Sequence, residues 1–254
     1  MGSIPWSGVS EMELMRRQQQ REKLSRATLC PSEMYDVMLG CWRLDAGVRI
    51  SADAALRDIE RFSVSIRCIG DDAILLEWPA SNFGQIGIRD DVQQGIDLQS
   101  DDSRRQFTSL TVSADCVTTE SLLGSGAFGS VFNGTVTLSS GKKLDVAVKT
   151  MSTDGGSEIE TRQFEYEARL LSALSHPKIV SVLAVCFEGS RRMMMLELMV
   201  GGDLRSYLSQ HQEEVESDVV CLNDVCFQVS SAMAYLEGRR VVHRDLAARF
   251  ISHT

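Results

Sequence analysis

The sequence predicts an α+β fold with three parts: a separate N-terminal helical segment, an antiparallel sheet with one main helix, and the start of a helical region. Two observations support this. Between residues 11 and 62, apolar residues recur at the three- and four-residue spacing of helices. From residue 117 onward, short strands bounded by glycine-rich turns lead into a helix, more strands and then helices. A composition of 43% hydrophobic and 24% charged residues over 254 positions suits one or two globular domains.

The N-terminal region predicts a polar first helix and two amphipathic helices. Residues 63–115 are mixed in character and rich in acidic pairs, so we expect a linker that carries one short strand near residues 74–78. The predicted organisation is a helical segment at 1–65, a linker at 66–115 and a second unit at 116–254. The two apolar helix faces consist of Met34, Tyr35, Met38, Cys41 and Trp42, and of Ala52, Ala55, Leu56, Ile59 and Phe62.

The charge and cysteine content narrow the function classes. A formal net charge of −9 argues against a nucleic-acid partner and against a basic membrane-binding patch. No apolar run of membrane-spanning length and no signal peptide is present, so we expect a cytoplasmic chain, although a longer protein that contains it could still be attached to a membrane. Seven cysteines without C-x-x-C spacing indicate free thiols rather than a zinc site or disulfides.

A glycine-rich segment, LGSGAFGSVF, contains Gly124, Gly126 and Gly129 in a G-x-G-x-x-G pattern. Such glycines let backbone amides close over phosphates. A Rossmann turn would open a helix after the last glycine, whereas Val131 and the residues after it read as a strand that ends at a turn near residues 139–142. A strand-loop-strand lid over ATP fits best. Taken alone, the pattern is equally consistent with a glycine-rich hairpin that binds nothing.

The next strand contains VAVK, and its alternation places Ala147 and Lys149 on one face. In the helix that follows, Glu167 lies on an apolar face with Phe164 and Leu171. An unpaired buried carboxylate is unfavourable, so Glu167 requires a cation, and Lys149 is the natural partner. We expect Glu160 and Glu165, in contrast, to lie on a solvated face. Further along the chain, the predicted helix at 222–236 buries Leu222, Val225, Cys226, Val229, Met233 and Leu236.

Five segments in this order, LGSGAFGSVF, VAVK, FEYEA, HPKIV and VVHRDLAAR, resemble those of protein tyrosine kinases. The resemblance implies a protein-kinase-like fold, whose small lobe is the antiparallel sheet with its main helix. It also implies ATP as nucleotide and protein tyrosine as substrate. It further implies catalytic roles for Lys149, Glu167, Asp245 and Arg249, and nucleotide contacts from Leu123, Gly124, Gly126, Gly129, Val131, Ala147, Lys149, Leu196, Glu197 and Met199.

Within that resemblance, Val131 and Ala147 would cover the adenine, and Lys149 would pair with the α- and β-phosphates. Leu196 would be the gatekeeper, and the backbones of Glu197 and Met199 would meet the adenine edge. Asp245 would accept the proton of the substrate hydroxyl. The Ala-Ala-Arg that ends at Arg249 resembles tyrosine kinases rather than serine/threonine kinases.

The metal-binding groups of the family are missing at the expected positions. Mg²⁺ is expected of the family, but the position of its catalytic-loop Asn holds Phe250, and no D-F-G follows. We therefore expect impaired phosphoryl transfer. The alternative is a catalytically inactive pseudokinase or interaction fragment that binds nucleotide or a partner kinase.

The N-terminal segment CPSEMYDVMLGCW resembles the end of a tyrosine kinase large lobe. The resemblance therefore implies that the chain contains the C-terminal end of one kinase domain, followed by the truncated N-terminal part of a second. This is the organisation expected of a piece of a tandem-kinase protein. The resemblance pairs Arg49 with a glutamate of an A-P-E segment, and this sequence has no A-P-E, so we expect Arg49 to lack its family partner.

Overall fold

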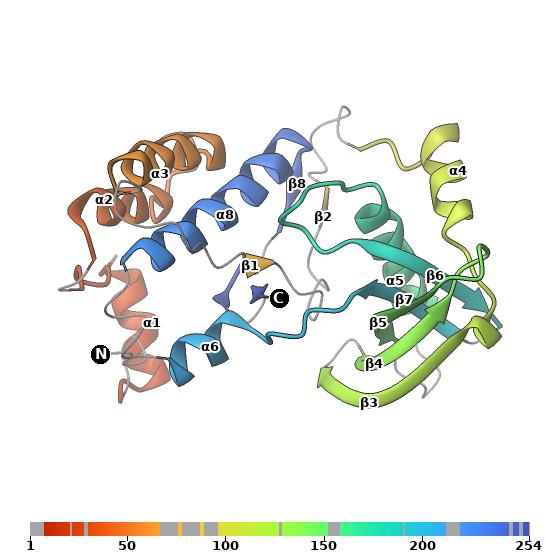
Figure 1. The fold of residues 1–254 in the computed structure, drawn as a ribbon. Coiled ribbons are helices and arrows are strands. Elements are labelled where there is room, and N and C mark those ends of the chain that lie inside the picture. Colours follow the sequence, from red (N-terminus) through yellow and green to blue (C-terminus); the bar gives the residue numbers. More distant parts are fainter. Residues whose placement is uncertain are drawn as a thin grey trace.

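The computed structural model describes residues 8–20, 22–27, 30–66, 76–77, 87–88, 96–126, 129–151, 158–189, 191–211, 219–243, 246–248 and 251–253. Figure 1 shows a sheet with helices α4 and α5 beside it, and a second group of helices that includes α2, α3 and α8. The predicted α+β class is confirmed. In the described part of the chain, no helix is both long enough and apolar enough to cross a membrane.

The central feature is a five-stranded antiparallel sheet with the strand order β3-β4-β5-β7-β6. Two hairpins form its first half, and their turns lie where the glycines predict them. Gly141 has a φ of 79° in the turn between β4 and β5, a conformation that favours glycine. The strands are β3 (Val117–Gly126), β4 (Gly129–Thr137), β5 (Lys143–Thr150), β6 (Val182–Glu188) and β7 (Arg191–Glu197).

Alternation along β5 divides the core between the two faces of the sheet. Val146 and Val148 are fully buried in a cluster on one face, together with Val136 and Met195. Ala147 packs in the other cluster, which includes buried residues of helix α5 (Glu158–Ser172). Side chains alternate between the faces of a strand, so Lys149 lies on the helix side with Ala147, as the sequence predicts.

The second group of helices includes α6 (Leu204–Gln210) and α8 (Val219–Gly238). Asp203 caps α6, because its side chain accepts a hydrogen bond from the backbone N–H of Ser206. The predicted burial of Leu222 is wrong, since this residue near the start of α8 is 37% exposed. Helix α8 instead turns a partly polar face inward, which the hydrophobic pattern could not indicate: its buried residues include Asn223, Asp224, Val225, Gln228, Ala232 and Leu236.

The N-terminal helices are α1 (Glu11–Gln19), α2 (Ser32–Cys41) and α3 (Ala52–Ile66). Helix α3 packs along α8, as Figure 1 shows. Ala55 and Ile59 on its predicted apolar face are buried. The backbone N–H of Asp53 donates to Glu237 Oε2 over 3.1 Å, so a carboxylate of α8 meets the first turn of α3.

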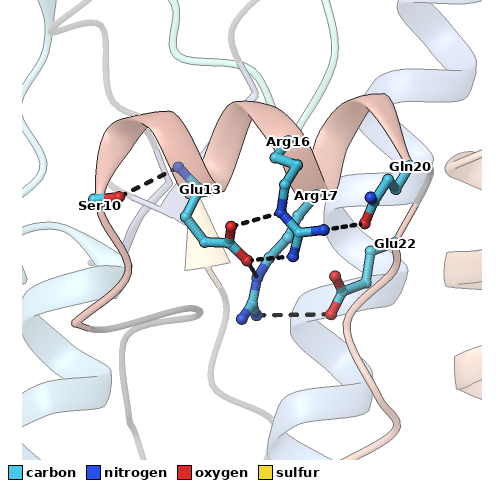
Figure 2. A network of polar contacts seen from close by, with 6 residues as sticks. All are labelled: Ser10, Glu13, Arg16, Arg17, Gln20 and Glu22. Atoms are coloured by element: carbon cyan, nitrogen blue, oxygen red, sulfur yellow. Dashed lines mark hydrogen bonds and ion pairs between the residues drawn. The ribbon is translucent and has the colours of Figure 1, made fainter.

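Helix α1 carries an exposed polar network, which Figure 2 shows. Arg16 holds both oxygens of Glu13 with hydrogen bonds of 2.6 Å, and Arg17 donates to the same carboxylate over 3.0 Å. These hydrogen bonds lower the pKa of Glu13 to about 2. The network fits the sequence prediction of a polar first helix, which is stabilised by its own side chains.

Arg49 forms hydrogen bonds with backbone carbonyls rather than with the A-P-E glutamate that the family resemblance implies. Its guanidinium donates to the backbone carbonyls of Arg43, over 2.7 Å, and Leu44, over 3.0 Å, and the side chain is exposed. Both carbonyls lie just after the end of α2, where backbone acceptors lack helical donors. Arg49 is thus exposed and hydrogen-bonded, whereas an arginine is strongly unfavourable only when it is buried and unpaired.

The stretch at 66–115 contains more structure than the single expected strand. Strand β1 (Leu76–Glu77) falls at the expected place and pairs with β9 (Ser252–His253). Strand β2 (Gly87–Ile88) pairs with β8 (Val241–Val242). Helix α4 (Asp101–Ser109) was not predicted. A short helical turn at Ala114–Cys116 follows it. The sequence of α4, DDSRRQFTS, offers a single large apolar residue and therefore no helical periodicity.

Candidate active site

The site is built around a buried ion pair between the sheet and helix α5. Lys149, near the end of β5, donates from Nζ to Glu167 Oε1 over 2.7 Å. Lys149 is 3% exposed and Glu167 is 9% exposed. The pairing that the sequence predicts is thus present. Each charge would be strongly unfavourable at this depth without the other, so the pair fixes α5 against the sheet.

The glycine-rich turn lies next to Lys149. Val131 of β4 pairs with Lys149 of β5, and Ser130 pairs with Thr150. At Gly129 the backbone has a φ of 129°, and a Cβ atom would lie 1.9 Å from the carbonyl oxygen of Thr150. Only glycine permits this approach, so Gly129 is a structural requirement of the turn. Gly124 and Gly126 lie on the opposite strand, β3, where Gly126 pairs with Gly129.

The residues assigned to the adenine lie on neighbouring strands. Ala147 of β5 pairs with Leu196 of β7, which is fully buried. The backbone N–H of Glu197 donates to the carbonyl of Ser181 over 3.1 Å, so this N–H is already engaged within the chain. Met199 is half-buried just beyond β7. Leu123, on β3, is largely exposed, as is typical of a residue at the mouth of a site.

The catalytic-loop residues Asp245 and Arg249 lie outside the described residues, as do Arg244 and Phe250. The chain on either side of them is well anchored. His243 and Ile251 are buried, and the carbonyl of Ile251 accepts a hydrogen bond of 2.6 Å from the backbone N–H of Leu204 at the start of α6. The structure therefore fixes both ends of this loop.

Glu165 differs from its predicted solvated position. It accepts a hydrogen bond of 3.1 Å from Arg192 Nε on β7, and the two form an ion pair. Arg192 also lies over the ring of Phe187, with its Cζ 5.7 Å from the ring centroid. The helix thus carries a second, more exposed link to the sheet. Glu160 is exposed, as predicted.

Sequence reasoning missed the contact between α4 and α5. Phe107 of α4 is buried against Arg169 of α5, whose Cζ lies 4.4 Å from the ring centroid. A single aromatic residue in a polar segment was the only available signal, and such a residue does not reveal its partner.

The residues that the structure describes contain no group of three or more His, Cys, Asp or Glu side chains placed to hold a metal ion. The loop position that carries the metal-binding Asn in kinases is Phe250, whose side chain has no oxygen or nitrogen to bind a cation. The described residues, together with Phe250, therefore offer no set of ligands that fits Mg²⁺.

Comparisons with known proteins show which sequences this chain resembles. The family model described as protein tyrosine and serine/threonine kinase matches residues 1–59 and 117–252. The transforming tyrosine kinase ros of UR2 avian sarcoma virus is 42% identical over 135 residues, which are 50% of this chain and 33% of that protein. The proto-oncogene tyrosine kinase ROS of Gallus gallus is 42% identical over 135 residues, 50% of this chain and 6% of that protein.

The tyrosine kinase Fer of Rattus norvegicus is 38% identical over 128 residues, which are 50% of this chain and 15% of that protein. The chain thus spans a third or less of each of these three relatives. The family model covers well over half of the chain. This chain belongs to the protein tyrosine kinase family.

Proposed function

We propose that this chain binds ATP and serves the transfer of its γ-phosphate to tyrosine residues of a protein. The observation that carries the proposal is the ion pair of Lys149 and Glu167. A buried ammonium group that points from a strand beside a glycine turn suits an anionic phosphate, and Glu167 holds the ammonium in place. Each half of the pair thus has a distinct role, one toward the phosphates and one toward the lysine.

Other residues of the chain supply shape and polarity. The amides of the turn at Gly124, Gly126 and Gly129 would close over the phosphates, since no side chain obstructs them. Val131 and Ala147 would cover the adenine, with Leu196 behind it. The carbonyl of Glu197 and the backbone of Met199 would meet the polar edge of the base.

Asp245 would accept the proton of the tyrosine hydroxyl, and Arg249 would lie beside it in the loop, as in tyrosine kinases. Metal ions neutralise charge during phosphoryl transfer in this family. The residues of this chain do not fit such metal ions, because Phe250 occupies the position of the metal-binding Asn and no D-F-G follows it within the 254 residues. We infer that these 254 residues by themselves transfer phosphate weakly.

The test is phosphorylation of a tyrosine-containing polymer by the chain with MgATP, read by an antibody to phosphotyrosine. The proposal predicts a weak signal that Lys149→Met abolishes. The matched control is Lys143→Met, because Lys143 is exposed on the same strand, and this variant should retain the wild-type signal. An equal signal in wild type and Lys149→Met would contradict the assigned role.

A second function, nucleotide binding without transfer, is favoured by Phe250. It predicts that MgATP raises the melting temperature of the wild-type chain while no phosphotyrosine forms, even after long incubation. No thermal shift at millimolar MgATP would count against both functions, because each requires the nucleotide site.

A further inference from the structure

Helix α4 lies between the two parts of the chain that the kinase family model matches, 1–59 and 117–252. It therefore belongs to the part of this chain that the family pattern does not account for. Figure 1 shows it beside α5, the helix that carries Glu167. The contacts between these two helices explain why a polar segment such as α4 is ordered at all.

Phe107 is the one residue of α4 that is buried, with 6% of its surface exposed. Its ring stacks on Phe187 of β6 at a centroid distance of 5.7 Å and an interplanar angle of 22°. The Phe107 ring also contacts Arg169, whose guanidinium Cζ lies 4.4 Å from the ring centroid. Both are favourable arrangements for an aromatic ring, so Phe107 joins the edge of the sheet to helix α5.

The aromatic contacts continue to the face of α5 that bears the catalytic glutamate. Phe187 meets Phe164 of α5 edge to face, at 6.3 Å and 89°. Phe164 lies three residues before Glu167 and is buried on the same helix face. Phe107, Phe164 and the neighbouring Ala168 and Leu171 belong to one apolar cluster. Removal of the Phe107 ring would therefore leave a cavity beside the helix turn that holds Glu167.

Hydrogen bonds also attach α4 and the residues after it to α5 and to strand β6. The side-chain amide of Gln106 donates to the carbonyl of Ser172, the last residue of α5, over 2.8 Å. Carbonyls at a helix C-terminus lack helical donors, so this bond supplies one of them. After α4, Leu110 and Val112 form backbone hydrogen bonds of 2.9 Å with Val185 of β6. The segment is thus attached to α5 and to the sheet at the same time.

From these contacts we propose that α4 positions α5, with Phe107 as a positioning residue that keeps Glu167 within reach of Lys149. The affinity of the site for nucleotide would then depend on a segment outside the region matched by the family model. The nucleotide part of this inference rests on the proposed function. The positioning of α5 does not, because it concerns contacts within the chain.

The experiment compares Phe107→Ala with wild type in two measurements. The first is the dissociation constant for MgATP, which should rise about tenfold, as is usual for coupling between separate sites. The second is amide hydrogen exchange without nucleotide, which should accelerate across residues 164–172. The control is Val136→Ala, a buried residue in the cluster on the opposite face of the sheet, which should change neither. Phe107→Leu keeps an apolar side chain and should restore most of the affinity.

A thermodynamic cycle with Glu167→Gln separates positioning from general destabilisation. If Phe107 acts through Glu167, Phe107→Ala should change nucleotide affinity by less than about twofold in the Glu167→Gln background. An undiminished effect in that background would overturn the proposal. So would wild-type affinity in Phe107→Ala.

If the wild-type chain binds no nucleotide, the proposed function fails, and hydrogen exchange alone decides the inference. Faster exchange of α5 in Phe107→Ala but not in Val136→Ala supports it. Unchanged exchange of α5 overturns it. Should Phe107→Ala fail to fold, the same comparison is made with Gln106→Ala, which removes only the hydrogen bond to Ser172.

Discussion

At the scale of single residues, the ion pair of Lys149 and Glu167 couples stability to function. Each partner is buried, so the loss of one leaves the other charged and unsolvated. Apolar residues of similar size are often at least as stabilising as a buried ion pair. The ion pair is therefore weak evidence for a gain in stability, and it is consistent with the proposed nucleotide site.

This view predicts a difference between single and double variants. Lys149→Met should lower the free energy of unfolding by about 3 kcal/mol, because Glu167 remains buried without a partner. The double variant Lys149→Met with Glu167→Leu should recover most of that loss, while its nucleotide binding stays as weak as in Lys149→Met. Urea denaturation measures both, with exposed Lys143→Met as the unaffected control. A double variant as unstable as Lys149→Met would contradict the argument.

His176 provides a pH-dependent test at the same scale. Its Nδ1 accepts a hydrogen bond of 3.1 Å from the backbone N–H of Lys178, and its ring stacks on Tyr235 at 5.0 Å. Burial lowers the pKa of His176, and the charge of Lys178 lowers it further. The folded state thus favours the neutral ring, whereas the unfolded state takes up a proton near its ordinary pKa.

Since the unfolded chain binds more protons in this window, stability should fall as the pH drops from about 6.5 through the lower folded pKa, and then level off. In His176→Asn that step should be missing. Urea denaturation between pH 5 and 8 measures it. Parallel stability curves for wild type and variant would show that His176 does not contribute.

At the scale of elements, local signals decided how well each helix or strand could be predicted. Strand β5 alternates, helix α5 shows helical periodicity, β6 and β7 contain continuous apolar runs, and Gly129 and Gly141 mark turns. Helix α4 lacks such a pattern, because only Phe107 is buried. Its order comes from contacts with α5 and β6, which are distant in sequence and cannot be read from the segment itself.

Asp203 is a residue type that is typical of helix N-caps, so the sequence indicates that it stabilises the start of α6. Asp203 accepts from the backbone N–H of Ser206 over 2.9 Å, and also from its hydroxyl. Asp203→Ala should therefore reduce the free energy of unfolding by about 1 kcal/mol. The exposed neighbour Arg205→Ala is the control, with a change expected within about 0.5 kcal/mol. Equal stability of the two variants would mean that the cap contributes nothing.

At the scale of the whole molecule, residues far apart in sequence form shared structure. Helix α3 packs along α8, and β1 and β2 pair with β9 and β8. The sequence indicated the apolar face of α3, on which Ala55 and Ile59 are buried. It could not indicate that α3 and α8 cover each other, because an amphipathic face names no partner. The inward polar residues of α8, such as Asn223 and Gln228, were missed because a hydrophobic pattern marks only apolar positions as buried.

If the contact between α3 and α8 stabilises both helices, a substitution in α3 should also destabilise α8. Ile59 of α3 is 4% exposed, and Ile59→Ala should lower the free energy of unfolding by about 2–4 kcal/mol. It should also accelerate amide hydrogen exchange in α8. Arg61→Ala, with an exposed side chain on the same helix, is the matched control. Normal exchange of α8 in a destabilised Ile59→Ala would indicate that the two helices unfold independently.

The central claim is that these residues form a nucleotide site organised by Lys149 and Glu167. Its most direct test is a calorimetric titration of the folded wild-type chain and of Lys149→Met with MgATP. The account predicts saturable binding at one site in wild type and at least about tenfold weaker binding in Lys149→Met, the loss expected when a charge-assisted contact to phosphate is removed. Absence of binding by the folded wild-type chain, or equal affinity in the variant, would contradict it.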